Sequence, residues 1–216
     1  MEAVDAMVDS AGNMPSMPGV FPDYSAPIVR NSANGRELAL ARWGMPSSEW
    51  RMRQATEKRA NKLRAKGKAF DFKELLSVEP DGGVTNIRDT DNRHWTRWYG
   101  LEHRCVVPFT SFSENEDAPS GGRQPVWFSL DESRPLAFFA GLWVNWTSVR
   151  KVREGIVNAD LFGFLTCGAN VEVHAIHPKA MPVILRTREE IDTWMTAPAQ
   201  DALALQRPLP DGSLSI

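Results

Sequence analysis

Three short segments of the chain place polar and charged side chains at the edges of apolar runs, where a hydrophobic core would exclude them. Residues 86–88 supply an amide and a guanidinium, residues 104–114 a second guanidinium and a carboxyl group, and residues 177–182 an imidazole. An amide, a carboxyl group and an imidazole that meet in a fold could orient a substrate and move protons near neutral pH. The sequence therefore predicts a functional site, provided that the fold brings the three segments together.

The first segment consists of Asn86, Ile87 and Arg88. On a strand, residues two apart project to the same face, so Asn86 and Arg88 would share a face while Ile87 enters the core. A guanidinium beside a carboxamide suits a phosphate or a carbonyl oxygen, because both groups donate hydrogen bonds. The alternative is a surface turn in which these polar groups only cap the end of a strand.

Glu114 follows Phe109 and Phe112 at the end of a phenylalanine-lined strand. Partial desolvation there would raise the pKa of the carboxyl group and suit it to proton transfer. A strand-end carboxylate in a polar loop is an equal alternative, since Asn115 and Glu116 follow at once.

His177 is expected at the C-terminal end of a short helix, because Pro178 disfavours helical geometry in the residue before it. That end of a helix favours a positive charge, and the rigid Met181-Pro182 pair follows. A single histidine beside an apolar run is more often structural. Its local sequence therefore leaves both a catalytic and a structural role open.

Arginines and tryptophans alternate in a fourth segment. Arg93 and Arg97 interleave with Trp95 and Trp98, a pattern typical of proteins that hold single-stranded nucleic acid by charge and base stacking. The same tryptophans, together with Tyr99, have helical spacing, which favours packing in the core instead.

Residues 49–83 have the character of a basic insertion. Between residues 49 and 68 the chain carries eight Lys or Arg residues against two acids, with few apolar side chains at helical spacing. We expect an exposed helix in this basic stretch. A charged run of this kind is most often a solvated face, although it could also contact phosphate groups.

Strand and helix signals indicate how these residues are positioned. Strands are expected where Val, Phe, Trp and Leu cluster between turn residues, at 36–43, 84–88, 105–114, 125–130, 136–146, 161–166 and 183–185. Helices are expected at 49–68, 92–99, 168–176, 187–194 and 198–206, the fourth opened by a capping box of Thr187 and Glu190. Residues 1–27 form a Pro-rich arm, with the tail of a helix at 2–9. The short connections favour an α+β fold, a single domain on a curved, mainly antiparallel sheet.

Composition limits the partners and the compartment. The chain has 216 residues and a net charge of −2, so binding to nucleic acid requires a local patch and not bulk charge. Cys105 and Cys167 form no spaced metal or disulfide framework and fit a reducing cytosol. No apolar run approaches the ~20 residues of a membrane span, and no secretory signal opens the chain. We therefore expect a cytoplasmic protein without a membrane or metal partner.

In their order along the chain, these segments resemble the SOS-response-associated peptidase (SRAP) family. The residues that carry the resemblance are Arg42-Trp43-Gly44, Asn86-Ile87-Arg88, residues 104–108 with Phe112 and Glu114, Leu165-Thr166 with Ala169-Asn170, and His177 with residues 181–185. The resemblance extends from about Gly19 to Pro210, nearly the whole chain. It implies an α+β fold with an open, barrel-like sheet, in a nucleoid-associated monomer of the cytoplasm.

Members of this family bind single-stranded DNA, recognise abasic sites and form a covalent crosslink with the opened sugar aldehyde. Their nucleophile is a cysteine directly after the initiator methionine, whose α-amine and thiol close a thiazolidine ring with the aldehyde. The resemblance therefore implies a DNA-damage enzyme with SRAP-type peptidase and lyase chemistry, which needs no cofactor.

The resemblance also implies roles for individual residues. Asn86 would orient the N-terminal residue and the sugar, while Glu114 and His177 would transfer protons during imine formation and reversal. Contacts with DNA are expected from Arg88, Arg97, Arg104, Trp43 and Lys179.

The chain departs from the family pattern at several positions. Position 2 is Glu2 in place of cysteine, and no cysteine occurs before Cys105. Asn115 replaces the tryptophan that commonly follows the catalytic glutamate, and Lys179 only approximately replaces a basic residue of the family. We expect neither Cys105 nor Cys167 to substitute as the nucleophile, because each lies in an apolar run and lacks a free α-amine.

The sequence leaves three functions open. The first is an active crosslinking protein whose true start, with a Met-Cys beginning and the first strand of the family, lies upstream of this chain. The second is a crosslink-deficient module that holds damaged single-stranded DNA non-covalently through Arg88, Arg97 and Arg104. The third is a peptidase that cleaves other proteins, for which the family name is the main argument.

Overall fold

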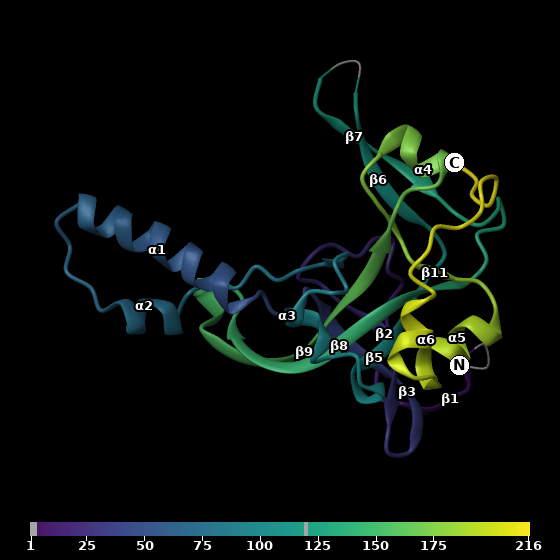
Figure 1. Ribbon diagram of the computed structural model, residues 1–216, viewed down its shortest axis with the longest axis horizontal. Coiled ribbons are helices and arrows are strands. Elements are labelled where there is room, and N and C mark those ends of the chain that lie inside the picture. Colours follow the sequence, from purple (N-terminus) through teal and green to yellow (C-terminus); the bar gives the residue numbers. More distant parts are fainter. Residues whose placement is uncertain (1–3, 119–120) are drawn as a thin grey trace.

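The computed structural model describes residues 4–118 and 121–216, and a closed β-barrel lies at its centre (Figure 1). Five long strands form the barrel: β2 (Ser25–Ser32), β3 (Gly35–Trp43), β5 (Arg104–Phe109), β8 (Ala137–Val149) and β9 (Ile156–Cys167). Neighbouring strands pair antiparallel in the order β3-β2-β5-β8-β9, and a parallel pairing of β9 with β3 closes the sheet. The expected α+β class and the barrel-like, mainly antiparallel sheet are confirmed.

Shorter elements extend and cover the barrel. β1 (Ala6–Asp9) pairs parallel with β3, β4 (Asn86–Ile87) parallel with β9, β10 (Met181–Pro182) antiparallel with β9, and β11 (Ile184–Leu185) antiparallel with β8. A separate hairpin consists of β6 (Phe112–Asp117) and β7 (Arg123–Phe128). The helices are α1 (Glu49–Ala65), α2 (Phe72–Ser77), α3 (Arg93–Thr96), α4 (Val171–Ile176), α5 (Arg188–Thr196) and α6 (Ala199–Leu203), with 3-10 turns at Leu101–His103 and Val152–Glu154.

Two glycines let the barrel strands approach closely. A Cβ atom on Gly141 of β8 would lie 2.9 Å from Sγ of Cys105 on β5. A Cβ atom on Gly163 of β9 would lie 3.0 Å from Cγ of Met45. Both distances are shorter than ordinary van der Waals contact, so neither position accepts a larger residue without a shift of its neighbours. Buried side chains of the barrel strands, among them Ile28, Leu142 and Phe162, belong to the hydrophobic core.

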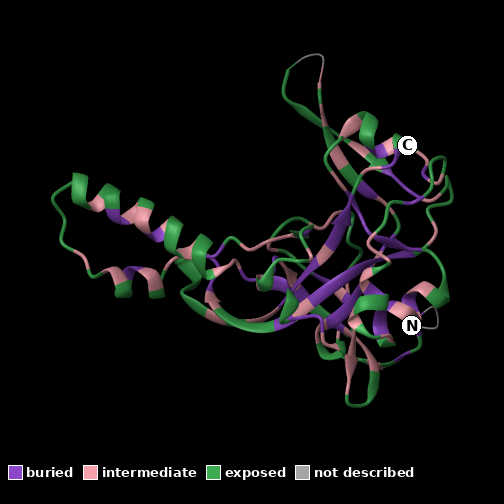
Figure 2. Ribbon diagram, viewed as in Figure 1, coloured by how far each residue is buried: buried purple, intermediate pink, exposed green. Residues whose placement is uncertain are grey.

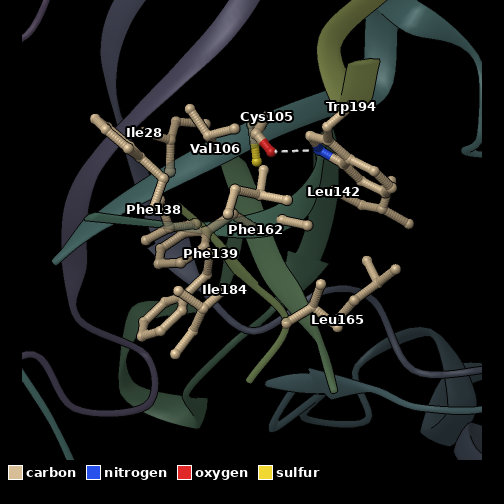
Figure 3. Close-up of a cluster of buried hydrophobic side chains, with 14 of the residues drawn as sticks. Ile28, Cys105, Val106, Phe138, Phe139, Leu142, Phe162, Leu165, Ile184 and Trp194 are labelled. Atoms are coloured by element: carbon tan, nitrogen blue, oxygen red, sulfur yellow. Dashed lines mark hydrogen bonds between the residues drawn. The ribbon is translucent and has the colours of Figure 1, made fainter. Parts of the chain in front are cut away.

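The core unites residues of the barrel with α5 and β11. Figure 3 shows buried side chains of this cluster, among them Ile28, Cys105, Val106, Phe138, Phe139, Leu142, Phe162, Leu165, Ile184 and Trp194. Trp194 of α5 is 1% exposed, and its Nε1 donates a hydrogen bond of 2.8 Å to the carbonyl oxygen of Cys105. Truncation of such a buried tryptophan typically costs about 3–5 kcal/mol. Trp194 therefore holds α5 against the barrel.

Local capping signals locate the helix starts. The Thr187 side chain accepts a hydrogen bond from the Glu190 amide, and the Glu190 carboxylate accepts one from the Arg186 amide. The first bond satisfies a backbone donor that the first turn of α5 leaves free, and the second satisfies the amide of the residue before the cap. The start of α5 at the predicted capping box is therefore confirmed, and Asn170 caps α4 in a similar way.

The N-terminal arm contains a strand where the sequence suggested the tail of a helix. Residues Ala6–Asp9 form β1, and Ala6 pairs with Arg36 at the beginning of β3. Val4 and Ala6 are buried against the barrel. The helix prediction is wrong over residues 6–9, because the free hydrogen-bonding edge of β3 outweighs local preference. Residues 2 and 3 of that prediction lie outside the described part of the chain.

Helices α1 and α2 project from the barrel as an arm (Figure 1). Ser48 caps α1, and most of the helix surface is exposed, with Thr56 and Ala60 as its buried residues (Figure 2). The prediction of an exposed helix in the basic stretch is confirmed. Among the residues that the structure describes, no helix is long and apolar enough to cross a membrane.

Candidate active site

Aromatic rings gather where β3 ends. Trp43 stacks on Phe164 of β9 with 5.3 Å between ring centroids, and Phe164 lies 4.8 Å from Phe139 of β8. The indole Nε1 of Trp43 donates a hydrogen bond of 3.2 Å to the carbonyl oxygen of Thr85. This contact fixes the indole beside the chain that enters β4. Trp43 and Phe164 remain partly exposed, so this aromatic wall reaches the surface.

Asn86 and Arg88 lie on the segment next to this aromatic wall. Asn86 pairs with Phe164 and Ile87 with Leu165 in the parallel pairing of β4 with β9. Ile87 is fully buried, whereas Asn86 and Arg88 are exposed, so the predicted alternation is confirmed. Residues directly opposite on paired strands project to the same face, which places the Asn86 amide on the side of Phe164.

Glu114 and His177 meet across β6 and the end of α4. Oε2 of Glu114 lies 3.9 Å from Nδ1 of His177. His177 is the C-terminal capping residue of α4, and its backbone amide donates a hydrogen bond of 2.7 Å to the carbonyl oxygen of Val173. The separation exceeds a direct hydrogen bond but leaves the two groups electrostatically coupled. The fold therefore brings together the carboxyl group of the second segment and the imidazole of the third, two of the groups that the predicted site requires.

Burial changes the pKa of Glu114, the acid of this pair. Desolvation raises the pKa of Glu114 above its ordinary value, and the nearby His177 opposes part of this increase. Phe112, two residues earlier on β6, stacks on Phe128 with 5.3 Å between ring centroids and packs edge-on against Phe139 with 6.0 Å between centroids. Phe112 shares a face of β6 with Glu114, because the two residues are two apart on the strand. A carboxyl group with a raised pKa keeps its proton to higher pH, which suits a proton donor.

Arg104 has a structural role in place of the expected phosphate contact. It is 2% exposed, and its guanidinium donates hydrogen bonds of 2.6–3.0 Å to the carbonyl oxygens of Tyr99, Trp194 and Ala197. Because the donors face inward and already have partners, no guanidinium surface is left for a phosphate. The DNA-contact prediction for Arg104 is therefore withdrawn.

Arg97 and Lys179 are exposed, as a DNA contact requires. The Arg97 guanidinium lies 3.9 Å above the ring of Trp98 and 5.7 Å from that of Trp146, which holds it in one orientation. Trp98 is buried, as are Trp95 and Tyr99, so the core-packing alternative for these aromatics is the correct one.

The family comparison covers most of these residues. The family model described as SOS response associated peptidase (SRAP) matches residues 84–216 of the chain. The chain belongs to the SRAP family. Asn86, Arg88, Glu114 and His177 lie inside the matched range, whereas Trp43 and the α1–α2 arm lie outside it.

A solved structure shares the fold of this SRAP chain. It is an X-ray crystal structure of a protein from Bacteroides thetaiotaomicron, with a TM-score of 0.58 and 20% sequence identity over 89% of this chain and 72% of that one. At this identity the likeness concerns the fold alone. The curated proteins include no match to this chain.

The two cysteines of the SRAP chain are buried. Burial raises the pKa of the Cys105 thiol far above its usual range and that of Cys167 to about 11, although Arg88 and Arg207 oppose the second shift. Neither thiol forms a reactive thiolate near neutral pH. In addition, no group of three or more metal-binding side chains occurs within residues 4–118 and 121–216.

Gln206 is a positioning residue that sequence reasoning missed. Its Nε2 donates hydrogen bonds of 2.8 Å to the carbonyl oxygen of Arg88 and 2.9 Å to that of Thr166 on β9, and its Oε1 accepts one from Thr90. The amide thereby ties the end of β4 to β9. No local pattern marks Gln206, because its partners lie far away in the sequence.

Proposed function

We propose that this SRAP protein binds single-stranded DNA and acts at abasic sites, where it condenses with the opened sugar aldehyde. The observation that carries the proposal is the contact between Glu114 and His177, with the raised pKa of Glu114. Family membership supports the reaction type. The Glu114–His177 pair offers a proton donor and a second titratable group, and the exposed Asn86 amide lies beside the aromatic wall. These are the types of group that an aldehyde condensation needs.

Each group has a step in the proposed reaction. An amine nitrogen adds to the aldehyde carbon and forms a carbinolamine, and loss of its hydroxyl group as water leaves an imine. Glu114 donates the proton to the departing hydroxyl, and His177 removes the proton that the nitrogen releases. Asn86 donates a hydrogen bond that orients the sugar. The reverse proton transfers release the DNA, and in the family they accompany peptidase and lyase chemistry.

The proposed DNA path uses the exposed cations and the aromatic wall. Arg88 and Lys179 would hold phosphates next to the site, while Arg97 would contact the strand farther along. Trp43 would stack on a base beside the abasic position. Arg104 is no longer part of this set, since its guanidinium is buried and bonded to carbonyl oxygens.

In the covalent form of this proposal, an N-terminal cysteine supplies both the amine and the thiol, as in the family. Glu2 stands at position 2 of this chain, outside the described residues. Addition of the thiol to the imine carbon would close the thiazolidine and stabilise the crosslink.

A non-covalent DNA-binding module is the second candidate, and the course of β1 favours it. β1 pairs with the beginning of β3, next to Arg36, whereas Trp43 ends β3. Seven residues along a strand span about 23 Å. With this arrangement Val4 lies near the opposite end of β3 from the aromatic wall. In this candidate the exposed cations and the aromatic wall hold the abasic strand without a bond.

A gel experiment separates the two candidates. The parent chain and its Glu2→Cys variant are incubated with a labelled single-stranded oligonucleotide that contains one abasic site, with and without borohydride. A shifted band that survives denaturation supports the covalent form, and loss of this band in Glu114→Gln links it to the site. Binding on a native gel without such a band supports the non-covalent module. Absence of binding by both proteins contradicts both candidates.

A further inference from the structure

The basic residues of α1 fall into two sets. Arg53, Arg59 and Arg64 form ion pairs of 3.0, 3.4 and 2.7 Å with Glu49, Glu79 and Glu57, respectively. Arg51, Lys58 and Lys62 are exposed and form no ion pair with any residue of the described chain. We call this second set the basic stripe.

The basic stripe lies on one side of α1. Lys58 follows the buried Thr56 by two residues, and Lys62 follows the buried Ala60 by two residues. A step of two residues turns about 200° around a helix, so both lysines point away from the buried side. Arg51 precedes Lys58 by seven residues, nearly two full turns, and shares its face. The three cations therefore form a row that faces solvent.

Stability does not explain this row. Lys58 and Lys62 are four residues apart, a spacing at which like charges repel on a helix. The arm buries few side chains, chiefly Thr56 and Ala60 of α1 and Leu75 of α2. The whole stretch from residue 49 to 68 carries eight basic residues against two acids in a chain whose net charge is −2. An anionic ligand would relieve the repulsion between these cations. A face that only contacts water would not require the unpaired cations to be gathered on one side of the helix.

The base of the arm adjoins the proposed DNA path. Nε2 of His94 lies 2.8 Å from the carbonyl oxygen of Pro46, just before α1 begins. His94 belongs to α3, whose C-terminal capping residue is Arg97. The exposed and oriented Arg97 guanidinium thus lies on the element to which the base of the arm is fixed. A strand held by Arg97 therefore passes close to the base of the arm.

We propose that the basic stripe binds the phosphate backbone of the DNA that continues beyond the candidate site. This inference rests on the proposed DNA binding and deepens it, because it assigns the arm a contact that lengthens the bound segment. The arm takes no part in the chemistry. A row of single cations suits phosphates, whose contacts carry no sequence information.

Two charge-matched variants test the proposal. The ligand is single-stranded DNA without an abasic site, so the experiment measures binding and no reaction with the sugar. The stripe variant is Arg51→Gln, Lys58→Gln and Lys62→Gln, and the control is Arg53→Gln, Arg59→Gln and Arg64→Gln. Each removes three positive charges from the same helix. Circular dichroism establishes that both retain their helix, and fluorescence anisotropy gives the dissociation constant of a long single-stranded oligonucleotide against salt concentration.

We expect the stripe variant to lose about two units of the slope of log K against log salt, since each phosphate contact contributes about 0.7 for single strands. The control should lose much less. A short oligonucleotide that covers only the candidate site should bind parent and stripe variant equally. Equal slopes for parent and stripe variant, or equal losses in both variants, would overturn the proposal. Loss of binding in the parent itself would instead contradict the proposed function, which keeps the two failures distinct.

Discussion

Oε2 of Glu114 lies 3.9 Å from Nδ1 of His177, although one residue belongs to the β6–β7 hairpin and the other ends α4. Neither element belongs to the barrel. The hairpin reaches the barrel through Phe112, and β10, which follows His177, reaches it by pairing with β9. The pair is thus held from two sides, and a change in either support should alter the separation of the two groups.

The first prediction concerns catalysis by Glu114. Glu114→Gln keeps the shape of the side chain but cannot donate a proton, so the rate of imine formation on abasic DNA should fall by about 10²–10⁴-fold. Single-turnover borohydride trapping measures this rate in the parent chain, because borohydride reduces an imine formed by any amine of the protein. Affinity for intact single-stranded DNA should stay within about twofold. Undiminished trapping in Glu114→Gln would remove the proposed role.

A second prediction concerns the effect of Glu114 on stability. Its pKa is raised in the folded protein, so the folded state binds this proton more tightly than the unfolded state. The contribution of Glu114 to stability therefore falls as pH rises from the ordinary value of 4.5 through the raised pKa. Glu114→Gln should have a higher Tm than the parent at neutral pH, and the difference should shrink toward pH 4.5. Thermal unfolding over this range checks the sign.

Neutral substitution of Arg104 should lower the stability of the fold, whereas neutral substitution of Arg88 should weaken the binding of DNA. Arg104→Met leaves three buried carbonyl oxygens without donors, and we expect it to lower the free energy of unfolding by about 3–5 kcal/mol. Arg88→Gln removes an exposed cation, so stability should be unchanged while the salt slope of single-stranded DNA binding falls by about 0.7. Urea unfolding and anisotropy titrations measure both quantities. A folded Arg104→Met that selectively loses DNA affinity would restore the phosphate role.

Asp23 should stabilise the fold above its depressed pKa. Burial alone would raise the pKa of Asp23, but hydrogen bonds from Arg42, Lys151 and Arg150 lower it to about 2 from an ordinary value of 3.8. The resulting stabilisation, about 2 kcal/mol, is present above pH 3.8 and is lost as pH falls toward 2. Asp23→Asn should be destabilised by about this amount at pH 7. Unfolding measured at several pH values should show the gap closing below pH 4.

The two thiols should be unreactive in the folded protein. Because both cysteines are buried and their pKa values are raised, a thiol reagent at pH 8 should label Cys105 and Cys167 only after unfolding. Absorbance of the released chromophore with and without denaturant measures this. The Cys105→Ala and Cys167→Ala double variant should keep any borohydride-trapped product. A fast-reacting thiol in the native protein would reopen the possibility of an internal nucleophile.

Much of the fold follows from local patterns. Runs of Val, Phe and Trp between turn residues indicated four of the five barrel strands, whereas β2 was missed because its first residues were assigned to the Pro-rich arm. The β2–β3 hairpin turns at residues 33 and 34, next to the Asn34-Gly35 pair that marks a tight turn in the sequence. The capping signal at Thr187 located the start of α5. These features depend on neighbours within a few residues, which a sequence displays directly.

The errors have a different origin. β1 forms where a helix tail was predicted, because its hydrogen-bond partner is the distant edge of β3. Arg104 is buried because Trp194 and Ala197, which follow it by 90 and 93 residues, supply carbonyl oxygens at the same point. No pattern of neighbouring residues shows such an acceptor pocket.

The sequence by itself determined the types of groups available for chemistry, the alternation that exposes Asn86 and Arg88, and the basic character of α1. Tertiary structure alone decided that Glu114 lies beside His177 and that the Arg104 guanidinium is buried. It also decided that, among the described residues, Arg51, Lys58 and Lys62 form no ion pair, whereas Arg53, Arg59 and Arg64 pair with acids. The physical reason is that the pKa, burial and pairing of a charged group depend on the atoms that surround it in space. Folding brings those atoms from elements that are far apart in the chain.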